Sequence, residues 1–211
     1  MINIIEYTFF LLLLIAPIKK STPLSNEIIV DSNLSFSQAI SGTKAPKDVT
    51  DRLILLDVEY YSFDEKLHRG QLVIHKDLKQ DIEEIFKFIK STKFPIAKVI
   101  PIVHYNWSDN ASMLDNNTSS FNYRKVAGKS KLSNHSFGTA IDINPFINPA
   151  VYSDGKISPK GAKYDPEVKG AISSETPLTL EFQKRGWIWG GTWNSLKDYQ
   201  HFEKTVPRLK Y

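Results

Sequence analysis

Apolar residues change their spacing along this chain, and each change marks a predicted element. Residues 53–61 (LILLDVEYY) and 70–75 (GQLVIH) are rich in leucine, β-branched and aromatic residues, which predicts two strands. From Asp77, which stands at an expected N-cap, to Ser91, apolar side chains recur at helical spacing. The first part of the chain therefore contributes two strands followed by a helix.

The second half alternates short apolar segments with long polar ones. Residues 96–103 predict a strand that Pro101 restricts to an edge or a bulge. Further expectations are a strandless functional loop over 106–130, a strand over 137–143, an insertion over 144–175, a helix over 176–184 and a last strand over 199–205. Because strands and helices mix without βαβ alternation, we expect an α+β fold with a small antiparallel sheet flanked by helices.

The N-terminal segment has a different pattern. Residues 7–18 (YTFFLLLLIAPI) form an uncharged apolar run that is too short for a membrane span but suits a signal peptide. We expect residues 1–20 to be a signal peptide or an uncleaved membrane anchor, although a buried helix is an alternative. Residues 21–45 are expected to be a linker and 46–211 the functional domain, exported to the cell envelope, periplasm or exterior.

Composition narrows the chemistry that the domain can carry. The 211 residues include no cysteine, which excludes disulfides, iron–sulfur clusters, thiol nucleophiles and cysteine-built zinc sites. Any metal site must use carboxylates and the five histidines. The net charge of +4 suits an anionic partner. No nucleic-acid-binding module is recognisable, so we expect no nucleic-acid partner, and we expect a monomer.

Two histidines have carboxylates at suggestive spacings. Asp142 lies in an apolar strand (AIDI) where it points away from Ile141 and Ile143, and His135 precedes it by seven residues. Near the C-terminus, Asp198 precedes His201 by three residues. His135, Asp142 and His201 make the three-ligand set of an open catalytic zinc site, and Asp198 is then available as a general base.

Each of these residues also has a structural alternative. His135 could be a solvated loop histidine, Asp142 a buried hydrogen-bonding hub and Asp198 a surface carboxylate. Glu203 is expected to pair with a basic neighbour. The remaining three histidines have no evident carboxylate partner and are taken as structural: His68, His75 and His104.

The same residues lie in motifs that resemble a known family. SNHSFGTAID, which spans Ser133 to Asp142, and the downstream D-x-x-H at Asp198 and His201 resemble zinc peptidases of the VanY-like D-alanyl-D-alanine carboxypeptidase family. The similarity is greatest to the branch with phage endolysins and L-alanyl-D-glutamate peptidases. It extends over residues 40–204 through HRGQLVIHKD, FPIAKVIPI, the segment ending FNYR, GWIWGGTW and DYQHFE.

This resemblance implies the roles of individual residues. It implies that Zn²⁺ is bound by His135, Asp142 and His201, and that Asp198 is the catalytic base. Arg124 matches an arginine that polarises the scissile carbonyl, with a loop-ordering salt bridge as the alternative, and Ser133 matches a serine near the metal. The implied fold is a small antiparallel sheet with flanking helices, shared with the hedgehog signalling domain.

The resulting hypothesis is a zinc peptidase that acts on peptidoglycan peptides. It would cut the D-Ala–D-Ala or the L-Ala–D-Glu bond, a choice that the sequence leaves open. Trp187, Trp189 and Trp193 could form an apolar wall for the substrate, with core packing as the alternative for each of them, and Trp189 is the chosen candidate. The alternative is a noncatalytic module of the same fold that keeps zinc as a structural element and binds the cell wall.

Overall fold

The longest strands, β2 (Leu53–Tyr61) and β3 (Leu67–His75), pair as an antiparallel hairpin that begins the domain's main layer. The computed structural model describes residues 27–206. Both strands were predicted, and β3 begins at Leu67 rather than at Gly70 because its register continues to pair with β2 as far as Tyr61. The hairpin supports one face of the core.

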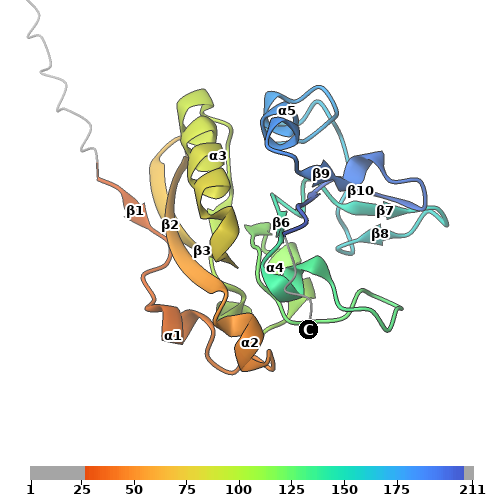
Figure 1. Cartoon of the computed structure of the whole chain (residues 1–211). Helices are drawn as coiled ribbons and strands as arrows, with labels where there is room; N and C mark the ends of the chain where they lie inside the picture. Colours follow the sequence, from red (N-terminus) through yellow and green to blue (C-terminus); the bar gives the residue numbers. More distant parts are fainter. Residues whose placement is uncertain (1–26, 207–211) are drawn as a thin grey trace, which may run out of the picture.

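Helix α3 (Lys79–Thr92) packs on this hairpin, as Figure 1 shows. Its buried side chains recur at helical spacing, as the sequence predicted: Ile82, Ile85, Phe86 and Ile89. The expected N-cap at Asp77 is wrong because a 3₁₀ turn, η1 (Lys76–Leu78), precedes the helix. Asp77 lies in this turn and donates its backbone N–H to Nδ1 of His75 at 3.3 Å.

Much of the expected linker belongs to the folded domain. Strand β1 (Ile29–Val30) pairs in parallel with β3, and Oε1 of Gln71 accepts hydrogen bonds from the hydroxyl of Ser32 and the backbone of Leu34. Two short helices follow, α1 (Phe36–Ala39) and α2 (Lys47–Thr50). The apolar side chains of this segment pack in a small second core cluster, which explains why it is ordered on the domain.

The middle of the chain differs from its prediction in two places. The expected strand over 96–103 is only β4 (Lys98–Val99), because a 3₁₀ helix follows Pro101. The segment 106–130 was expected to lack regular structure, but the hydroxyl of Ser108 caps a helix there. The elements that follow β4 are η2 (Ile102–Tyr105), α4 (Asp109–Leu114) and β5 (Asn117–Thr118).

The C-terminal half contributes two three-stranded antiparallel sheets, ordered β6-β11-β9 and β10-β7-β8. Its helix α5 (Pro177–Lys184) agrees with the prediction. The other elements are η3 (Asn134–Phe137), β6 (Ala140–Asp142), β7 (Ala150–Tyr152), β8 (Ile157–Ser158), β9 (Ile188–Trp189), η4 (Gly190–Thr192), β10 (Leu196–Asp198) and β11 (His201–Glu203).

The fold is therefore α+β, as predicted, but its strands form several small sheets instead of one. Two pairings are parallel, β1 with β3 and β4 with β5. The main core joins the β2–β3 hairpin and α3 to α5 and the β6-β11-β9 sheet (Figure 1). Within residues 27–206, no helix has the length and apolarity that a membrane crossing requires. The predicted signal or anchor segment lies outside the described residues.

Candidate functional site

Asp142 and His201 face each other on neighbouring strands. In the antiparallel pairing of β6 with β11, His201 is the direct partner of Asp142. Ile141 and Ile143, which flank Asp142, are fully buried in the main core. The apolar flanks therefore fix the strand, and the alternation predicted from the sequence turns the carboxylate toward His201.

His135 reaches this pair from η3, a tight turn that ends at Gly138. Gly138 has a positive φ of 63° and its carbonyl accepts the backbone N–H of His75. A Cβ at this position would lie 2.8 Å from that nitrogen, so the turn requires glycine. Ser133 caps the other end, where its hydroxyl accepts the backbone N–H of His135 at 3.3 Å.

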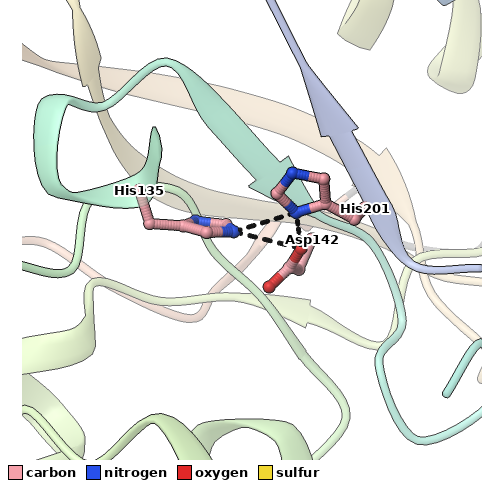
Figure 2. A group of neighbouring side chains, drawn as sticks. All are labelled: His135, Asp142 and His201. Carbon is pink, nitrogen blue, oxygen red and sulfur yellow. Dashed lines mark hydrogen bonds and ion pairs between the residues drawn. The ribbon is translucent and has the colours of Figure 1, made fainter. Parts of the chain in front are cut away.

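The three side chains present one atom each to a common point (Figure 2). Oδ1 of Asp142 lies 2.9 Å from Nδ1 of His201 and 3.2 Å from Nε2 of His135, and the two nitrogens are 3.2 Å apart. Ligands bound tetrahedrally to zinc at its usual bond lengths lie about 3.3 Å from one another. The triangle thus has nearly the size that one zinc ion requires, and its donor types fit zinc.

The outer nitrogen of each histidine is held by an acceptor. Nδ1 of His135 donates to the backbone carbonyl of Ser120 at 2.6 Å, and Nε2 of His201 donates to Oε2 of Glu203 at 3.0 Å. A neutral imidazole that donates through one nitrogen offers the lone pair of the other. The lone pairs of Nε2 in His135 and Nδ1 in His201 then face Oδ1 of Asp142, as metal ligation demands.

Charge is strongly localised in this buried group. Burial disfavours the carboxylate of Asp142, but His135 and His201 outweigh burial and hold the pKa of Asp142 well below its usual range. Burial also acts against a charged His201, yet the hydrogen bonds to Asp142 and Glu203 raise the pKa of His201 to about 10. Without metal, the protonated ring of His201 and the carboxylate of Asp142 therefore form an ion pair that holds the centre together.

Asp198 lies beside the centre, at the end of β10. A turn at residues 199–200 separates it from β11, so it does not share one strand with His201, as the sequence analysis required. Its Oδ1 is buried and has no hydrogen-bond partner among the described residues. Burial raises the pKa of Asp198 to about 6, although the charge of His201 opposes the shift. A carboxylate poised near neutral pH is suited to proton transfer.

A cleft of about 580 Å³ opens above these residues. Its lining includes all three candidate ligands and Asp198, together with Ser133 and Arg124. Nε of Arg124 lies 2.9 Å from Oδ1 of Asp109, so the salt bridge that the sequence left as an alternative does form. Arg124 nevertheless lines the cleft, which means that the ion pair and a role toward substrate are compatible.

Trp189 is not placed as predicted. Its side chain is buried in the main core, its Nε1 donates to the carbonyl of Tyr199, and it is not part of the cleft lining. The structure therefore does not support the prediction that Trp189 binds substrate, because β9 directs its ring toward Phe202. Trp193 lines the cleft instead, with its ring centroid 5.1 Å from that of His201.

Sequence reasoning also missed some partners. Glu203 pairs with a basic neighbour, as expected, but that neighbour is His201, a ligand candidate, and the i, i+2 spacing on a strand was the available signal for this pair. His68 is not without carboxylates: Nδ1 lies 3.0 Å from Asp31 and Nε2 lies 3.2 Å from Asp64. Asp31 comes from the segment taken for a linker, which is why this contact was not foreseen.

Comparison with known proteins agrees with this geometry. The family model described as D-alanyl-D-alanine carboxypeptidase matches residues 127–204. The matched segment contains the three candidate ligands and Asp198, whereas Arg124 lies just before it. No solved structure gives a significant match to the chain. The resemblance seen in the sequence is thus confirmed over residues 127–204, which are similar to the D-alanyl-D-alanine carboxypeptidase family of peptidases.

Proposed function

We propose that this protein is a zinc-dependent peptidase that hydrolyses the stem peptides of peptidoglycan. The observation that carries the proposal is the cluster formed by His135, Asp142 and His201, with Asp198, whose buried Oδ1 has no hydrogen-bond partner, lining the same cleft. A purely structural metal site has no need for a carboxylate oxygen that is buried beside it without a hydrogen-bond partner. The match to a peptidase family supports the same conclusion.

The chain's own residues supply most of the reaction. When bound, zinc supplies Lewis-acid chemistry that makes water nucleophilic near neutral pH. Asp198 accepts the proton as water attacks the peptide carbonyl and then delivers it to the leaving amine. Arg124 stabilises the negative charge that develops on the carbonyl oxygen, an effect typically of about 3 kcal/mol on the barrier.

The cleft offers cations to the carboxylates of a bound peptide. Lys129 and Lys131 line it together with Arg124, while Tyr152 and Trp193 contribute aromatic surface. Stem peptides carry free carboxylates, which these cations attract, and the aromatic rings cover the apolar backbone of short residues such as alanine. The D-Ala–D-Ala and L-Ala–D-Glu bonds both satisfy this description, so the choice of bond must come from product analysis.

Digestion of purified muropeptides tests the proposal directly. The zinc-loaded full chain is incubated with a stem pentapeptide and with the same stem attached to its glycan, and products are identified by mass. Loss of a single alanine indicates a carboxypeptidase, and release of the stem from L-alanine indicates an endopeptidase. If zinc is bound and neither product forms, the chain is not a stem-peptide hydrolase.

Asp198 distinguishes catalysis from a noncatalytic zinc module. Asp198→Ala should retain zinc, because Asp198 is not one of the three converging ligands, and should lose turnover by at least about 100-fold. Ser195→Ala is the matched control and should stay active. Ser195 immediately precedes β10 and also lines the cleft. Equal activity and equal zinc content in Asp198→Ala would remove Asp198 from the role of base.

Export is part of the same proposal, since peptidoglycan lies outside the cytoplasmic membrane. The apolar run at residues 7–18 supports a signal peptide or an anchor. The intact mass of the protein recovered from the cell envelope and from the medium separates the two: a loss of about 20 residues marks cleavage, and the full mass marks an anchor. A protein recovered only from the cytoplasm would contradict export.

A further inference from the structure

His201 presents its two ring nitrogens to two different carboxylates. Nδ1 faces Asp142 in the centre of the site, and Nε2 lies 3.0 Å from Oε2 of Glu203 on its outer side. Glu203 follows His201 by two residues on β11, so both side chains project from the same face of the strand. The strand itself therefore carries a histidine together with the acceptor for its outer nitrogen.

Asn134 completes this outer contact. Its Nδ2 donates to the same Oε2 of Glu203 at 2.7 Å. Asn134 immediately precedes His135 on η3, so the Asn134–Glu203 hydrogen bond joins the two segments that carry the histidines. These segments are 69 residues apart in sequence for this pair, and a second tie, from the backbone N–H of Lys204 to the carbonyl of Thr139, lies nearby.

We propose that Glu203, held by Asn134, is a positioning residue that fixes the ring of His201 with Nδ1 directed at the metal. This inference rests on the zinc site of the proposed function. An Nε2–H that donates to Glu203 leaves the lone pair on Nδ1, and the charged acceptor makes that nitrogen a better donor to a cation. Without Glu203 the ring is free to rotate or to present the other tautomer.

A role in substrate binding explains the contacts less well. Glu203 lines the cleft, but its side chain is only 25% exposed and Oε2 is already used by both His201 and Asn134. An acidic side chain would also repel the carboxylates of a stem peptide. Both contacts of Oε2 instead tie Glu203 to the two segments that carry the histidines.

Metal affinity tests the proposal without relying on turnover. Zinc binding to the full chain is measured by chelator competition at a fixed pH, for wild type, Glu203→Ala, Glu203→Gln and Asn134→Ala. We expect Glu203→Ala to weaken zinc binding about 10- to 100-fold and Asn134→Ala to weaken it less. Glu203→Gln should recover much of the loss, because its amide oxygen can still accept from Nε2.

Glu59→Ala provides the matched control. Glu59 is also a strand glutamate with a charged partner, Lys90, and its side chain is 36% exposed. This variant should lose a comparable contact while zinc affinity remains that of wild type. If Glu203→Ala unfolds, Asn134→Ala still reports, since folded Asn134→Ala with the zinc affinity of wild type would contradict the proposal.

Spectroscopy separates positioning from general loss of stability. In zinc-loaded wild type, imidazole ¹⁵N spectra should show His201 bound through Nδ1 and protonated at Nε2, and cobalt-substituted protein should give a tetrahedral absorption band. Glu203→Ala should change both signals. Unchanged affinity and unchanged spectra in this variant overturn the positioning role alone.

The outcomes also separate this inference from the function on which it rests. Wild type that binds zinc with the expected His201 signals, but cuts no muropeptide, would overturn the peptidase and leave the positioning role supported. Wild type that binds neither zinc nor cobalt would overturn both.

Discussion

His201 and Asp142 are direct partners across the antiparallel β6–β11 ladder, with Nδ1 2.9 Å from Oδ1. Their side chains therefore meet because of strand register, and His135 needs only one glycine-ended turn to join them. The centre is built on backbone hydrogen bonds and on a core that is fully buried behind it. Such a support holds ligands rigidly and leaves the cleft side free for substrate.

His201→Ala should abolish zinc binding, because it removes one of three ligands from a rigid strand. We expect an affinity loss greater than about 100-fold, measured by elemental analysis and chelator competition. His104→Ala serves as the control, since this exposed histidine lies in η2 and does not line the cleft. Full zinc content in His201→Ala would mean that the ligand assignment is wrong.

Zinc uptake should release protons. The pKa of His201 is about 10 in the metal-free protein, so its ring is charged at neutral pH and must lose a proton before it can bind metal. Zinc affinity should consequently rise between pH 6 and pH 8, by up to about tenfold per unit, and acid should release the metal. Calorimetry in buffers of different ionisation enthalpy counts the protons; a pH-independent affinity would contradict this linkage.

Asp198 should make the metal-free protein less stable at neutral pH. Burial raises the pKa of Asp198 to about 6 from its ordinary value of 3.8, so the folded state holds this proton more tightly than the unfolded state. The stability that protonated Asp198 contributes to the folded state is fully present below pH 3.8 and is lost as pH rises through 6. Asp198→Asn should therefore raise the free energy of unfolding by about 1 to 3 kcal/mol at pH 8, and much less at pH 4.5.

Urea unfolding in the presence of chelator measures this difference. Glu175→Gln is a suitable control, because Glu175 is exposed and its replacement also removes one negative charge. An equal gain at both pH values, or a gain in the control, would show that burial of Asp198 is not its cause.

Gly190→Ala should damage activity more than stability. A Cβ at this position would lie 2.9 Å from Cβ of Asp198 and 3.3 Å from Cβ of His201, so both residues would be displaced. Small displacements of catalytic groups are costly, and we expect kcat/KM to fall about 10- to 100-fold. Gly42→Ala, at a glycine whose nearest such neighbour is 3.5 Å away, should leave activity intact.

The sequence predicted the His135–Asp142 part of the centre because that part is local, whereas His201, 59 residues from Asp142, was found through its D-x-x-H motif. Two of the three ligands lie seven residues apart around one glycine turn, and apolar neighbours fix the direction of Asp142. The D-x-x-H spacing also required a bend between Asp198 and His201, and the chain turns there. Periodicity likewise predicted α3, whereas α5 was predicted from Thr176-Pro177 at its start and Gly186 after its end.

Features that depend on distant contacts were not predictable. Trp189 and Trp193 are both aromatic residues in one segment, and only the packing of Trp189 against Phe202 decides which of them lines the cleft. The segment before residue 46 is rich in polar residues, yet Gln71 and β3 bind it through partners 37 or more residues away. Composition alone cannot reveal such partners.

The attachment of this N-terminal segment determines where the chain can be shortened. Asp31 accepts hydrogen bonds from the ring of His68 and from the hydroxyl of Tyr60, a fully buried side chain of the main core. Cutting the chain at residue 46 would remove Asp31 from the Tyr60 hydroxyl and would remove Ser32 and Leu34 from Gln71. It would also uncover the second core cluster. If the apolar run of residues 7–18 is removed by cleavage, we therefore expect the cut to fall before β1 begins at residue 29, so that these contacts are kept.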